Sequence, residues 1–408
     1  AQNSCGGSQW APTPQPGVKV LLVHNAYQRP GGEDVVFEQE RRLLERFGHQ
    51  VRVYHRTNDE IASKSRGIGI AAASIWSRRT DREMTKLLKE VEPDVVHVHN
   101  TFMVISPSVY WACSAAGVPV VQTLHNYRLL CPAATFFREG KVCEECISQG
   151  PWRGIRYACY RDSRMATATV AMMLSVHRLL GTWKEKIASY IALTHFARGK
   201  FIEAGFPAER IFVKPNFVDP DPGVRDSEGE YGLFIGRLMP EKRSDRVIQA
   251  LASVPSRLPF LIAGTGPERE RLEAEVANLG LSQVRFLGQV PREQAFSLIK
   301  KARFLVFPSE WYETFGLTMV EAFACGTPVI ATRMGTMQEI VEDGRTGLHF
   351  SPGDPEDLAR KIEWAWTHPA EMRAMGIEAR QEYEARYTAE KNYGQLIEIY
   401  QKAVHPLG

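Results

Sequence analysis

Short apolar runs alternate with amphipathic segments in the first half of the chain. Val, Ile and Leu dominate these runs, which predict buried strands at 18–23, 51–54, 94–98, 119–124 and 190–193. Apolar residues at helical spacing predict a helix over 33–47, ended by Gly48. Another helix is expected to close at 86–91. Ser106 and Pro107 are expected to open a third, since proline suits the first helical turn.

A second series of the same kind begins at residue 231. Its predicted strands lie at 231–235, 260–263, 284–287, 304–307 and 328–331, and its predicted helices at 244–254, 268–279, 293–302 and 316–324. Three further helices, 355–367, 369–386 and 389–404, are expected to finish the chain. Strands that alternate with helices form parallel sheets covered on both faces, so the predicted fold class is α/β with two doubly wound, Rossmann-like domains.

The segment between the two series has the composition of a linker. It is rich in proline, glycine and acidic residues from 215 to 230. We therefore expect one domain over 18–214 and a second over 215–386. The alternation breaks between 126 and 183, where a cysteine-rich insert is predicted. Two such sheets place a cleft between them, and ligands bind outside the carboxyl ends of parallel strands.

Composition changes this picture little, but the distribution of charge adds to it. The 408 residues are 44% hydrophobic and 24% charged, which is ordinary for a globular protein. The net charge of +3 hides an asymmetry, because residues 18–206 hold 26 Lys and Arg against 18 Asp and Glu. A basic first half favours an anionic substrate or a lipid surface nearby, although undirected drift of surface charge is the simpler explanation.

Three features bear on location. Residues 1–17 carry no charge and no apolar core, which predicts a flexible leader and not a signal peptide. The expected location is the cytoplasm, where most of the seven cysteines would stay reduced. The apolar run 165–180 is flanked by basic residues, so it is typical either of a buried helix or of a segment on the inner face of a membrane.

The most informative motif pairs two carboxylates, Glu313 and Glu321, on either side of Gly316. Gly316 permits a tight loop before a helix whose N-terminus attracts a phosphate. Glu321, one turn into that helix, suits a ribose diol, and Glu313 in the loop suits a sugar hydroxyl. Two surface carboxylates on a capped helix are the simpler alternative, which the following sequence AFACGTPVI makes less plausible.

Two more loops follow predicted strands of the second series. Gly236 precedes Arg237 and Lys242, and both cations can reach one diphosphate. Solvated surface cations are the alternative. The stretch GTGP brings Gly266 to the same edge of the sheet, although an isolated G-x-G is weak evidence.

The first series contributes a glycine pair and a histidine. Gly31 and Gly32 lie between the first strand and its helix, where their N–H groups suit a phosphate or a sugar, and Glu33 and Asp34 follow. His125 ends a later strand, where a histidine can bond a sugar hydroxyl or a developing charge. A buried, fully hydrogen-bonded histidine is the plainer explanation of His125 alone.

Taken in order, these motifs resemble family 4 of the glycosyltransferases, which have the GT-B fold of two Rossmann-like domains facing across a cleft. The resemblance runs from about residue 18 to the C-terminus and includes GRLMPEK at 236–242 and the E-x7-E motif. It implies transfer of a sugar from a UDP- or GDP-linked nucleotide-sugar with retention of anomeric configuration. It also implies that the last helix, within 387–408, crosses back onto the first domain.

The resemblance assigns roles to individual residues. It implies that the catalytic residues are His125, Arg237, Lys242 and Glu313. Donor-binding contacts are implied for Gly31, Gly32, Gly236, Gly266, Thr314, Phe315, Gly316, Leu317 and Glu321. No catalytic metal is expected, because the two cations can do electrostatically what a metal does elsewhere. The first domain would receive a glycan or lipid-linked acceptor, with Glu33 and Asp34 as candidate contacts. No nucleic acid is expected.

Four cysteines of the insert have the spacing C-x11-C-x2-C-x12-C, namely Cys131, Cys143, Cys146 and Cys159. The central pair can place two thiolates on one metal, and the flanking pair can complete a tetrahedral site for structural zinc. Four reduced thiols in an irregular insert and a pair of disulfides are the alternatives. Four protein ligands leave no open position on the metal for catalysis.

Two other functions fit parts of this pattern. A GT-B nucleotide-sugar epimerase would need no sugar acceptor. A non-catalytic nucleotide-sugar-binding protein would be expected to lack some of the charged set. Because Arg237, Lys242, Glu313 and Glu321 are all present, the sequence favours a transferase in surface polysaccharide or glycoconjugate synthesis.

Overall fold

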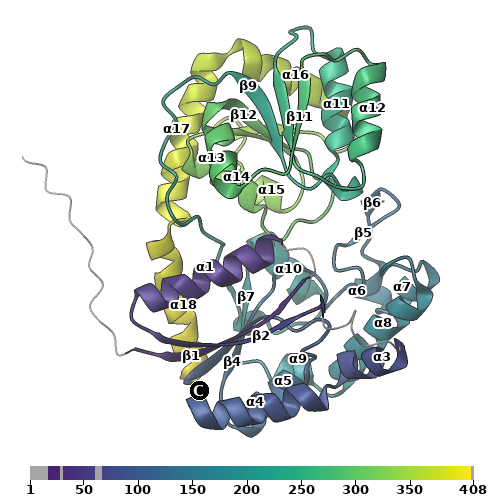
Figure 1. Ribbon diagram of the computed structural model, residues 1–408, viewed down its shortest axis with the longest axis vertical. Coiled ribbons are helices and arrows are strands. Elements are labelled where there is room, and N and C mark those ends of the chain that lie inside the picture. Colours follow the sequence, from purple (N-terminus) through teal and green to yellow (C-terminus); the bar gives the residue numbers. More distant parts are fainter. Residues whose placement is uncertain (1–16, 28–30, 60–66, 406–408) are drawn as a thin grey trace, which may run out of the picture.

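The computed structural model describes residues 17–27, 31–59 and 67–405, and it places two α/β domains one above the other (Figure 1). The leader expected over 1–17 lies, apart from Gly17, outside the described residues. Each domain is built on a six-stranded sheet whose neighbouring strands are all parallel. The predicted fold class, two doubly wound Rossmann-like domains, is confirmed.

The first sheet has the strand order β2-β1-β3-β4-β7-β8. Its strands are β1 (Lys19–Ala26), β2 (Gln50–Thr57), β3 (Val95–Asn100), β4 (Val120–Thr123), β7 (Ser189–Ala192) and β8 (Ile211–Val213). The helices of this domain are α1 (Gly32–Arg46), α3 (Gly67–Ile75), α4 (Arg78–Val91), α5 (Ser108–Ala115), α8 (Arg164–Leu179), α9 (Thr182–Glu185), α10 (His195–Glu203) and η1 (Ala208–Arg210). Strand β8 was not predicted, because its three residues are too few to show a pattern.

The second sheet has the order β11-β10-β9-β12-β13-β14, which reverses between β9 and β12. Its strands are β9 (Tyr231–Ile235), β10 (Phe260–Ala263), β11 (Val284–Gly288), β12 (Ala302–Phe307), β13 (Val329–Thr332) and β14 (Gly347–Phe350). Its helices are η2 (Pro240–Lys242), α11 (Ser244–Ser253), α12 (Arg269–Asn278), α13 (Arg292–Lys301), α14 (Leu317–Ala324), α15 (Thr336–Ile340), α16 (Pro355–Thr367) and α17 (Pro369–Arg386).

Side chains alternate between the two faces of the first sheet. Along β1, Leu21 and Val23 enter the core beneath α4, α5 and α8, whereas Val20 and Leu22 enter the core on the opposite face. All four are fully buried. This period of two, with apolar residues on both faces, is why the run reads as continuously hydrophobic.

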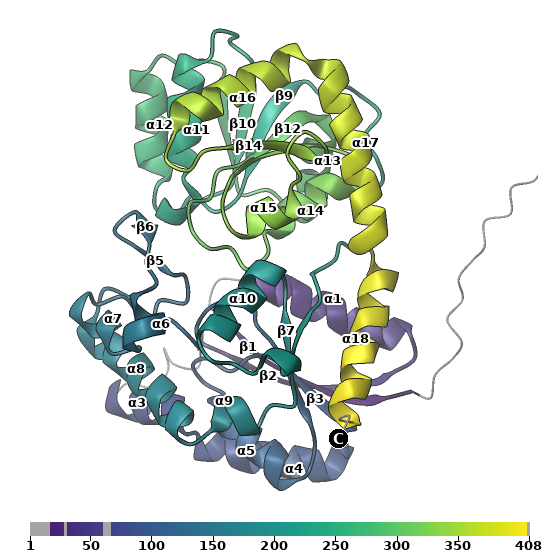
Figure 2. The same ribbon diagram turned by 180° about the vertical axis from the view of Figure 1, so that it is seen from behind.

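The last helix, α18 (Ala389–Val404), follows α17 out of the second domain and packs on the first (Figures 1 and 2). Its buried residues Leu396 and Tyr400 join the core formed by α1 and one face of the first sheet. The Tyr393 hydroxyl is hydrogen-bonded to the ring of His49 at 2.8 Å. The C-terminal helix thus ties the two domains together beside the linker.

The irregular segment predicted between residues 126 and 183 contains a small hairpin and three helices. The hairpin strands are β5 (Phe137–Arg138) and β6 (Lys141–Val142), followed by α6 (Glu145–Gln149), α7 (Arg153–Arg156) and α8. The hairpin projects from the first domain toward the second in both views (Figures 1 and 2). Among the described residues, no helix is both long and apolar enough to cross a membrane.

Candidate active site

A cleft between the two domains gathers most of the residues that the sequence singled out, and it encloses about 300 Å³. Those that line it are Gly32, Glu33, His125, Gly236, Arg237, Lys242, Glu313, Thr314, Phe315, Gly316 and Leu317. Its second-domain wall follows the ends of β9 and β12, where the strand order of the sheet reverses. This is the position at which open parallel sheets bind ligands.

Lys242 and Glu313 form an ion pair in the cleft, although the sequence assigned them to separate contacts with the ligand. The ammonium of Lys242 lies 2.5 Å from Oε1 of Glu313. The same oxygen accepts hydrogen bonds from the Ser309 hydroxyl at 2.9 Å and the Trp311 indole at 2.7 Å. Three donors therefore converge on this one oxygen of Glu313. An anion that binds Lys242 would therefore have to compete with Glu313.

Arg237 differs from Lys242 because its side chain is exposed where it lines the cleft. Within the described residues, no carboxylate forms an ion pair with Arg237, whereas Lys242 has Glu313. The Arg237 guanidinium is therefore available to an anion that enters the cleft, and its planar fork suits a phosphate.

The N-terminus of α14 also faces the cleft. Gly316 precedes the helix with φ of 87°, and a Cβ at this position would lie 2.6 Å from Cε of Met319. Glycine is thus required for the turn that starts the helix. Leu317 and Thr318 form its first turn and line the cleft. Free N–H groups of a first turn, with the helix dipole, attract an anion.

The loop that carries Glu313 contacts the first domain directly. The Thr314 hydroxyl donates a hydrogen bond to the carbonyl of His125 at 2.8 Å. The Thr194 hydroxyl bonds the carbonyl of Thr314 at 3.3 Å, and the Tyr127 hydroxyl bonds that of Glu313 at 3.4 Å. These bonds place both walls of the cleft in a fixed relation.

Two titratable groups of the first domain face the cleft in uncharged form. Burial, followed by the negative charge of Asp34, raises the pKa of Glu33 to about 8. Burial also holds the pKa of His125 well below its usual value. A protonated Glu33 can donate as well as accept a hydrogen bond. Asn126 donates to one of its oxygens at 3.4 Å, and the other has no partner among the described residues.

Two residues of the Gly31–Asp34 stretch lie away from the cleft lining. The backbone N–H of Gly31 donates to Asp34 at 2.7 Å, which caps α1. The second oxygen of Asp34 lies 2.9 Å from the ring of His24. These bonds use the N–H of Gly31 and the carboxylate of Asp34, which the sequence had suggested as contacts for a ligand.

Gly266 and Glu321 also lie outside the lining. A Cβ on Gly266 would come 2.1 Å from the carbonyl oxygen of Leu238, so this glycine allows two loops to pack. Glu321 is half-buried on α14, with its carboxylate 3.6 Å from the guanidinium of Arg292. Burial raises its pKa to about 7.

Four polar residues that line the cleft were missed in the sequence, namely Asn216, Ser309, Trp311 and Thr318. Asn216 lines the cleft from the linker, and its buried side-chain oxygen has no hydrogen-bond partner among the described residues. A polar side chain directly after Pro215 was its only signal. Ser309 and Trp311 lie just upstream of Glu313, but only the fold shows that they bond its carboxylate.

The four clustered cysteines of the insert differ in burial. Cys131 and Cys146 are buried, Cys143 and Cys159 are half-buried, and every cysteine in the described residues is free. The thiols of Cys131 and Cys146 are hydrogen-bonded, which lowers the pKa of Cys131 and raises that of Cys146. Burial and the charges of Cys131, Cys159 and Cys143 raise the pKa of Cys146 further.

Comparison with known proteins assigns the chain to a family. Residues 30–222 match the model of Glycosyltransferase Family 4, and residues 219–382 match that of Glycosyl transferases group 1. The two models together span both domains and the cleft between them. The chain belongs to the family 4 glycosyltransferases.

Individual relatives agree with this assignment. An uncharacterized glycosyltransferase of Methanocaldococcus jannaschii, MJ1178, is 34% identical over 47% of this chain and 54% of its own length. The chain thus spans about half the length of such curated relatives. A phosphatidyl-myo-inositol mannosyltransferase of Mycobacterium leprae is 26% identical over 93% of this chain and 96% of its own.

Solved structures share the fold. Anabaena Alr3699/HepE, crystallised in complex with UDP and glucose, has a TM-score of 0.66 and 20% identity. The match covers 93% of this chain and 98% of that structure. Sucrose-phosphate synthase of Thermosynechococcus elongatus has a TM-score of 0.71 and 18% identity, over 94% and 98% of the two chains. This chain therefore shares the GT-B fold with proteins of low sequence identity to it.

Proposed function

We propose that the protein transfers a sugar from a nucleotide-diphosphate-sugar to a glycan or lipid-linked acceptor, with retention of anomeric configuration. One observation carries this proposal: Arg237, Lys242 and the N-terminus of α14 converge on one wall of a cleft whose other wall holds His125 and Glu33. The UDP and glucose in the related Anabaena structure support a nucleotide-sugar as the ligand. Synthesis of surface polysaccharides or glycoconjugates is the process we propose.

The donor is proposed to bind mainly to the second domain. Arg237 and Lys242 bind the diphosphate together with the first turn of α14. Charge grows on the leaving diphosphate in the transition state, where preorganised cations contribute most. These cations take the place that a divalent metal has in other transferases. When a phosphate binds Lys242, the carboxylate of Glu313 becomes available to a sugar hydroxyl.

The acceptor is proposed to approach from the first domain. Glu33 faces the cleft beside His125 and offers both a donor and an acceptor of hydrogen bonds. Asp34 is a weaker candidate, because His24 and the backbone of Gly31 already occupy its oxygens. His125 is proposed to contact the donor sugar near the reacting carbon.

Product analysis tests this function. The protein is screened against UDP- and GDP-sugars by thermal shift, and the stabilising donor is then incubated with lipid-linked and glycan acceptors. A product with the donor's anomeric configuration is expected. A changed sugar without any acceptor would indicate the epimerase, and binding without turnover would indicate a binding protein.

We also propose that the four clustered cysteines hold one structural zinc ion. The interacting thiols support this, as does the backbone. Six of the nine non-glycine residues with positive φ in the described chain lie between 134 and 162. Such conformations are unfavourable and persist where other interactions impose them.

The thiols would move together on binding zinc. Among the described residues, only Glu40, His97 and His99 bring three ligand atoms within 4.8 Å of one another. No three of the clustered thiols lie that close, so they would have to approach one another to bind zinc.

The insert also contacts the second domain, because the ring of Phe136 packs on Tyr312 with centroids 6.3 Å apart. Order in the insert is thereby linked to the loop that carries Glu313.

Peripheral contact with an anionic membrane is a further proposal for the first domain. Buried residues of α8, such as Val170 and Leu174, belong to the core, so one face of the helix is structural. The other face leaves Met165, Met172 and Leu179 exposed at 80%, 43% and 88%. Basic residues flank this stripe, and apolar side chains beside cations suit a lipid interface.

A further inference from the structure

A chain of buried polar groups lies directly behind His125. Its Nε2 lies 2.9 Å from Nδ1 of His99. The other ring nitrogen of His99, Nε2, lies 3.4 Å from Oε2 of Glu40. The remaining oxygen of Glu40 lies 2.5 Å from the ammonium of Lys214. Glu40, His99 and Lys214 are buried, whereas His125 lines the cleft.

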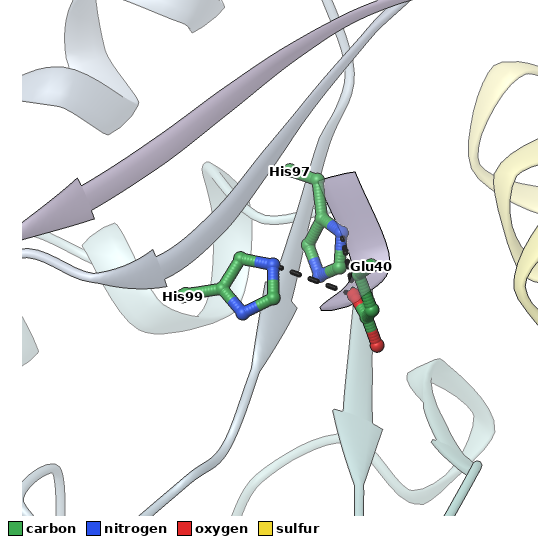
Figure 3. Close-up of side chains that lie close together, drawn as sticks. All are labelled: Glu40, His97 and His99. Atoms are coloured by element: carbon green, nitrogen blue, oxygen red, sulfur yellow. Dashed lines mark ion pairs between the residues drawn. The ribbon is translucent and has the colours of Figure 1, made fainter. Parts of the chain in front are cut away.

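Glu40, His97 and His99 form a candidate cation site, because their ligand atoms lie within 4.8 Å of one another. Figure 3 shows one carboxylate oxygen of Glu40 joined by dashed lines to a nitrogen of each ring. The nitrogens of His97 are already engaged, however. Nδ1 is hydrogen-bonded to the Tyr400 hydroxyl at 2.8 Å and Nε2 to the Thr123 hydroxyl at 2.7 Å. A metal would have to break the first of these bonds.

Lys214 argues against a cation for an electrostatic reason. Its ammonium is fully buried against Glu40 and already neutralises the charge of that carboxylate. It also donates to the side chain of Asn392 on α18 at 3.1 Å. A divalent ion on the other oxygen of Glu40 would add positive charge to a site that has a buried cation.

The charge of Glu40 decides where the protons of the two histidines lie. Oε2 of Glu40 lies 3.4 Å from Nε2 of His99, and neither atom has a hydrogen-bond partner among the described residues. A nitrogen lone pair 3.4 Å from a carboxylate oxygen is repelled by it, so we place the proton of His99 on Nε2. Burial holds the pKa of both His99 and His125 well below the usual value, so each ring has a single proton.

The position of this proton fixes which ring donates in the hydrogen bond between His99 and His125. With its proton on Nε2, His99 offers a lone pair at Nδ1. The hydrogen bond at 2.9 Å therefore requires Nε2 of His125 to donate. Nδ1 of His125 consequently has no proton. No hydrogen bond within the described residues uses that nitrogen.

We propose that Glu40 is a positioning residue, which acts through His99 to hold His125 in the tautomer with a proton on Nε2 and a lone pair on Nδ1. His125 then meets the ligand as a hydrogen-bond acceptor and selects a hydroxyl that donates. Lys214, which also bonds Asn392 on α18, holds the carboxylate in place. This inference rests on the proposed function only in so far as the ligand is the donor sugar.

The tautomer is tested on the full chain labelled with 15N-histidine. Two-bond correlations between ring nitrogens and ring protons report which nitrogen of each ring carries hydrogen, and the His125→Asn and His99→Asn variants identify the two spin systems. Protons on Nε2 of both rings are expected. A proton on Nδ1 of His125, or an unprotonated Nε2 of His99, would overturn the proposal, and the latter would point to a cation.

A kinetic test separates positioning from mere structure. Because Glu40→Gln alone leaves a buried lysine unpaired, the variant is Glu40→Gln/Lys214→Met, which removes both charges. We expect kcat to fall roughly tenfold, donor Kd to change less than twofold, and His125 to populate both tautomers. Glu45→Gln on the exposed face of α1 is the matched control. A folded double variant with unchanged kcat and tautomer would contradict the proposal.

The two proposals fail in different ways. The NMR result is obtained without turnover, so it stands if no transferase activity is found. If activity is found but His125 holds the other tautomer, only the role of Glu40 is wrong. If the double variant does not fold, the wild-type spectrum still decides.

Discussion

The hydroxyl of Thr314 donates a 2.8 Å hydrogen bond to the backbone carbonyl of His125 and so joins the two walls of the cleft. Thr314 directly follows Glu313, and His125 is the residue proposed to contact the donor sugar. The bond therefore sets the distance between the group that would hold the sugar and the group that would meet its hydroxyl. Small errors in such a distance lower rates strongly.

Thr314→Val removes this bond and keeps the shape of the side chain. We expect kcat/KM to fall roughly fivefold, which corresponds to about 1 kcal/mol for one hydrogen bond. Thr367→Val, at the exposed end of α16, is the control. If steady-state kinetics of Thr314→Val match the wild type, the contact has no part in aligning the walls.

Arg237→Ala and Lys242→Ala are each expected to slow transfer roughly a hundredfold, on the order of 3 kcal/mol, because each removes a cation from the leaving diphosphate. The fold should persist, since both side chains reach the cleft surface. Arg257→Ala, an exposed arginine of the same domain, is the control. Near-normal turnover of either variant at saturating donor would show that the assignment is wrong.

The ion pair with Glu313 adds a specific expectation for Lys242. Lys242→Met leaves the Glu313 carboxylate in the cleft, where it would repel a diphosphate. Adding Glu313→Gln removes that repulsion, so the double variant should bind nucleotide diphosphate more tightly than Lys242→Met alone. Isothermal titration checks this order, and a reversed order would mean that the two groups bind separate parts of the ligand.

Glu33 predicts a pH dependence of stability. Its carboxyl has an ordinary pKa of 4.5 and a folded-state pKa of about 8. Between these values the folded protein holds a proton that the unfolded chain releases, so stability falls as pH rises toward 8 and levels off above it. Urea unfolding at pH 6 and pH 9 measures this loss, about 3 kcal/mol for roughly two pH units at about 1.4 kcal/mol each. Glu33→Gln should lose less, and equal losses would refute the shifted pKa.

Local pattern was enough for much of the second domain. The helices at 355–367, 369–386 and 389–404 have the predicted bounds. Strong end signals explain this success: the Asp354 side chain caps the first helix by accepting from the N–H of Asp357, and Pro369 begins the second. Strand β14 was missed because its four residues include a glycine and a histidine, which hide the apolar alternation.

Pairings between distant residues were beyond the reach of the sequence. Lys242 and Glu313 lie in different loops, and Glu40 on α1 is 174 residues from Lys214, which follows β8. A periodic pattern reports which face of an element is buried, but it carries no information about which charges meet there. The sequence therefore identified many of the residues that line the cleft, and only the fold showed which charged side chains pair with each other.

The cysteine cluster predicts close to one zinc ion per chain in protein purified without chelator. Each thiol must lose its proton to bind, so the metal should be released on acidification. Cys143→Ser/Cys146→Ser should lose the metal and increase hydrogen exchange over 126–160, while nucleotide binding to the second domain persists. Cys113→Ser, a buried cysteine on α5, should retain it. Absence of metal from the wild-type protein would leave four reduced thiols as the explanation.

The exposed stripe on α8 predicts salt-sensitive binding to anionic vesicles. Met165, Met172 and Leu179 would enter the lipid interface while Arg164 and Arg178 meet the headgroups, and binding of this kind requires both the apolar area and the charge. Vesicles of phosphatidylglycerol should therefore carry the protein in flotation, whereas vesicles of phosphatidylcholine should not. Replacing the three apolar residues by serine should weaken binding roughly tenfold or more. Ile377→Ser, which removes a similarly exposed residue from α17, should leave binding unchanged. If the protein does not float, or floats equally well without the stripe, the outer face of α8 has no role at the membrane.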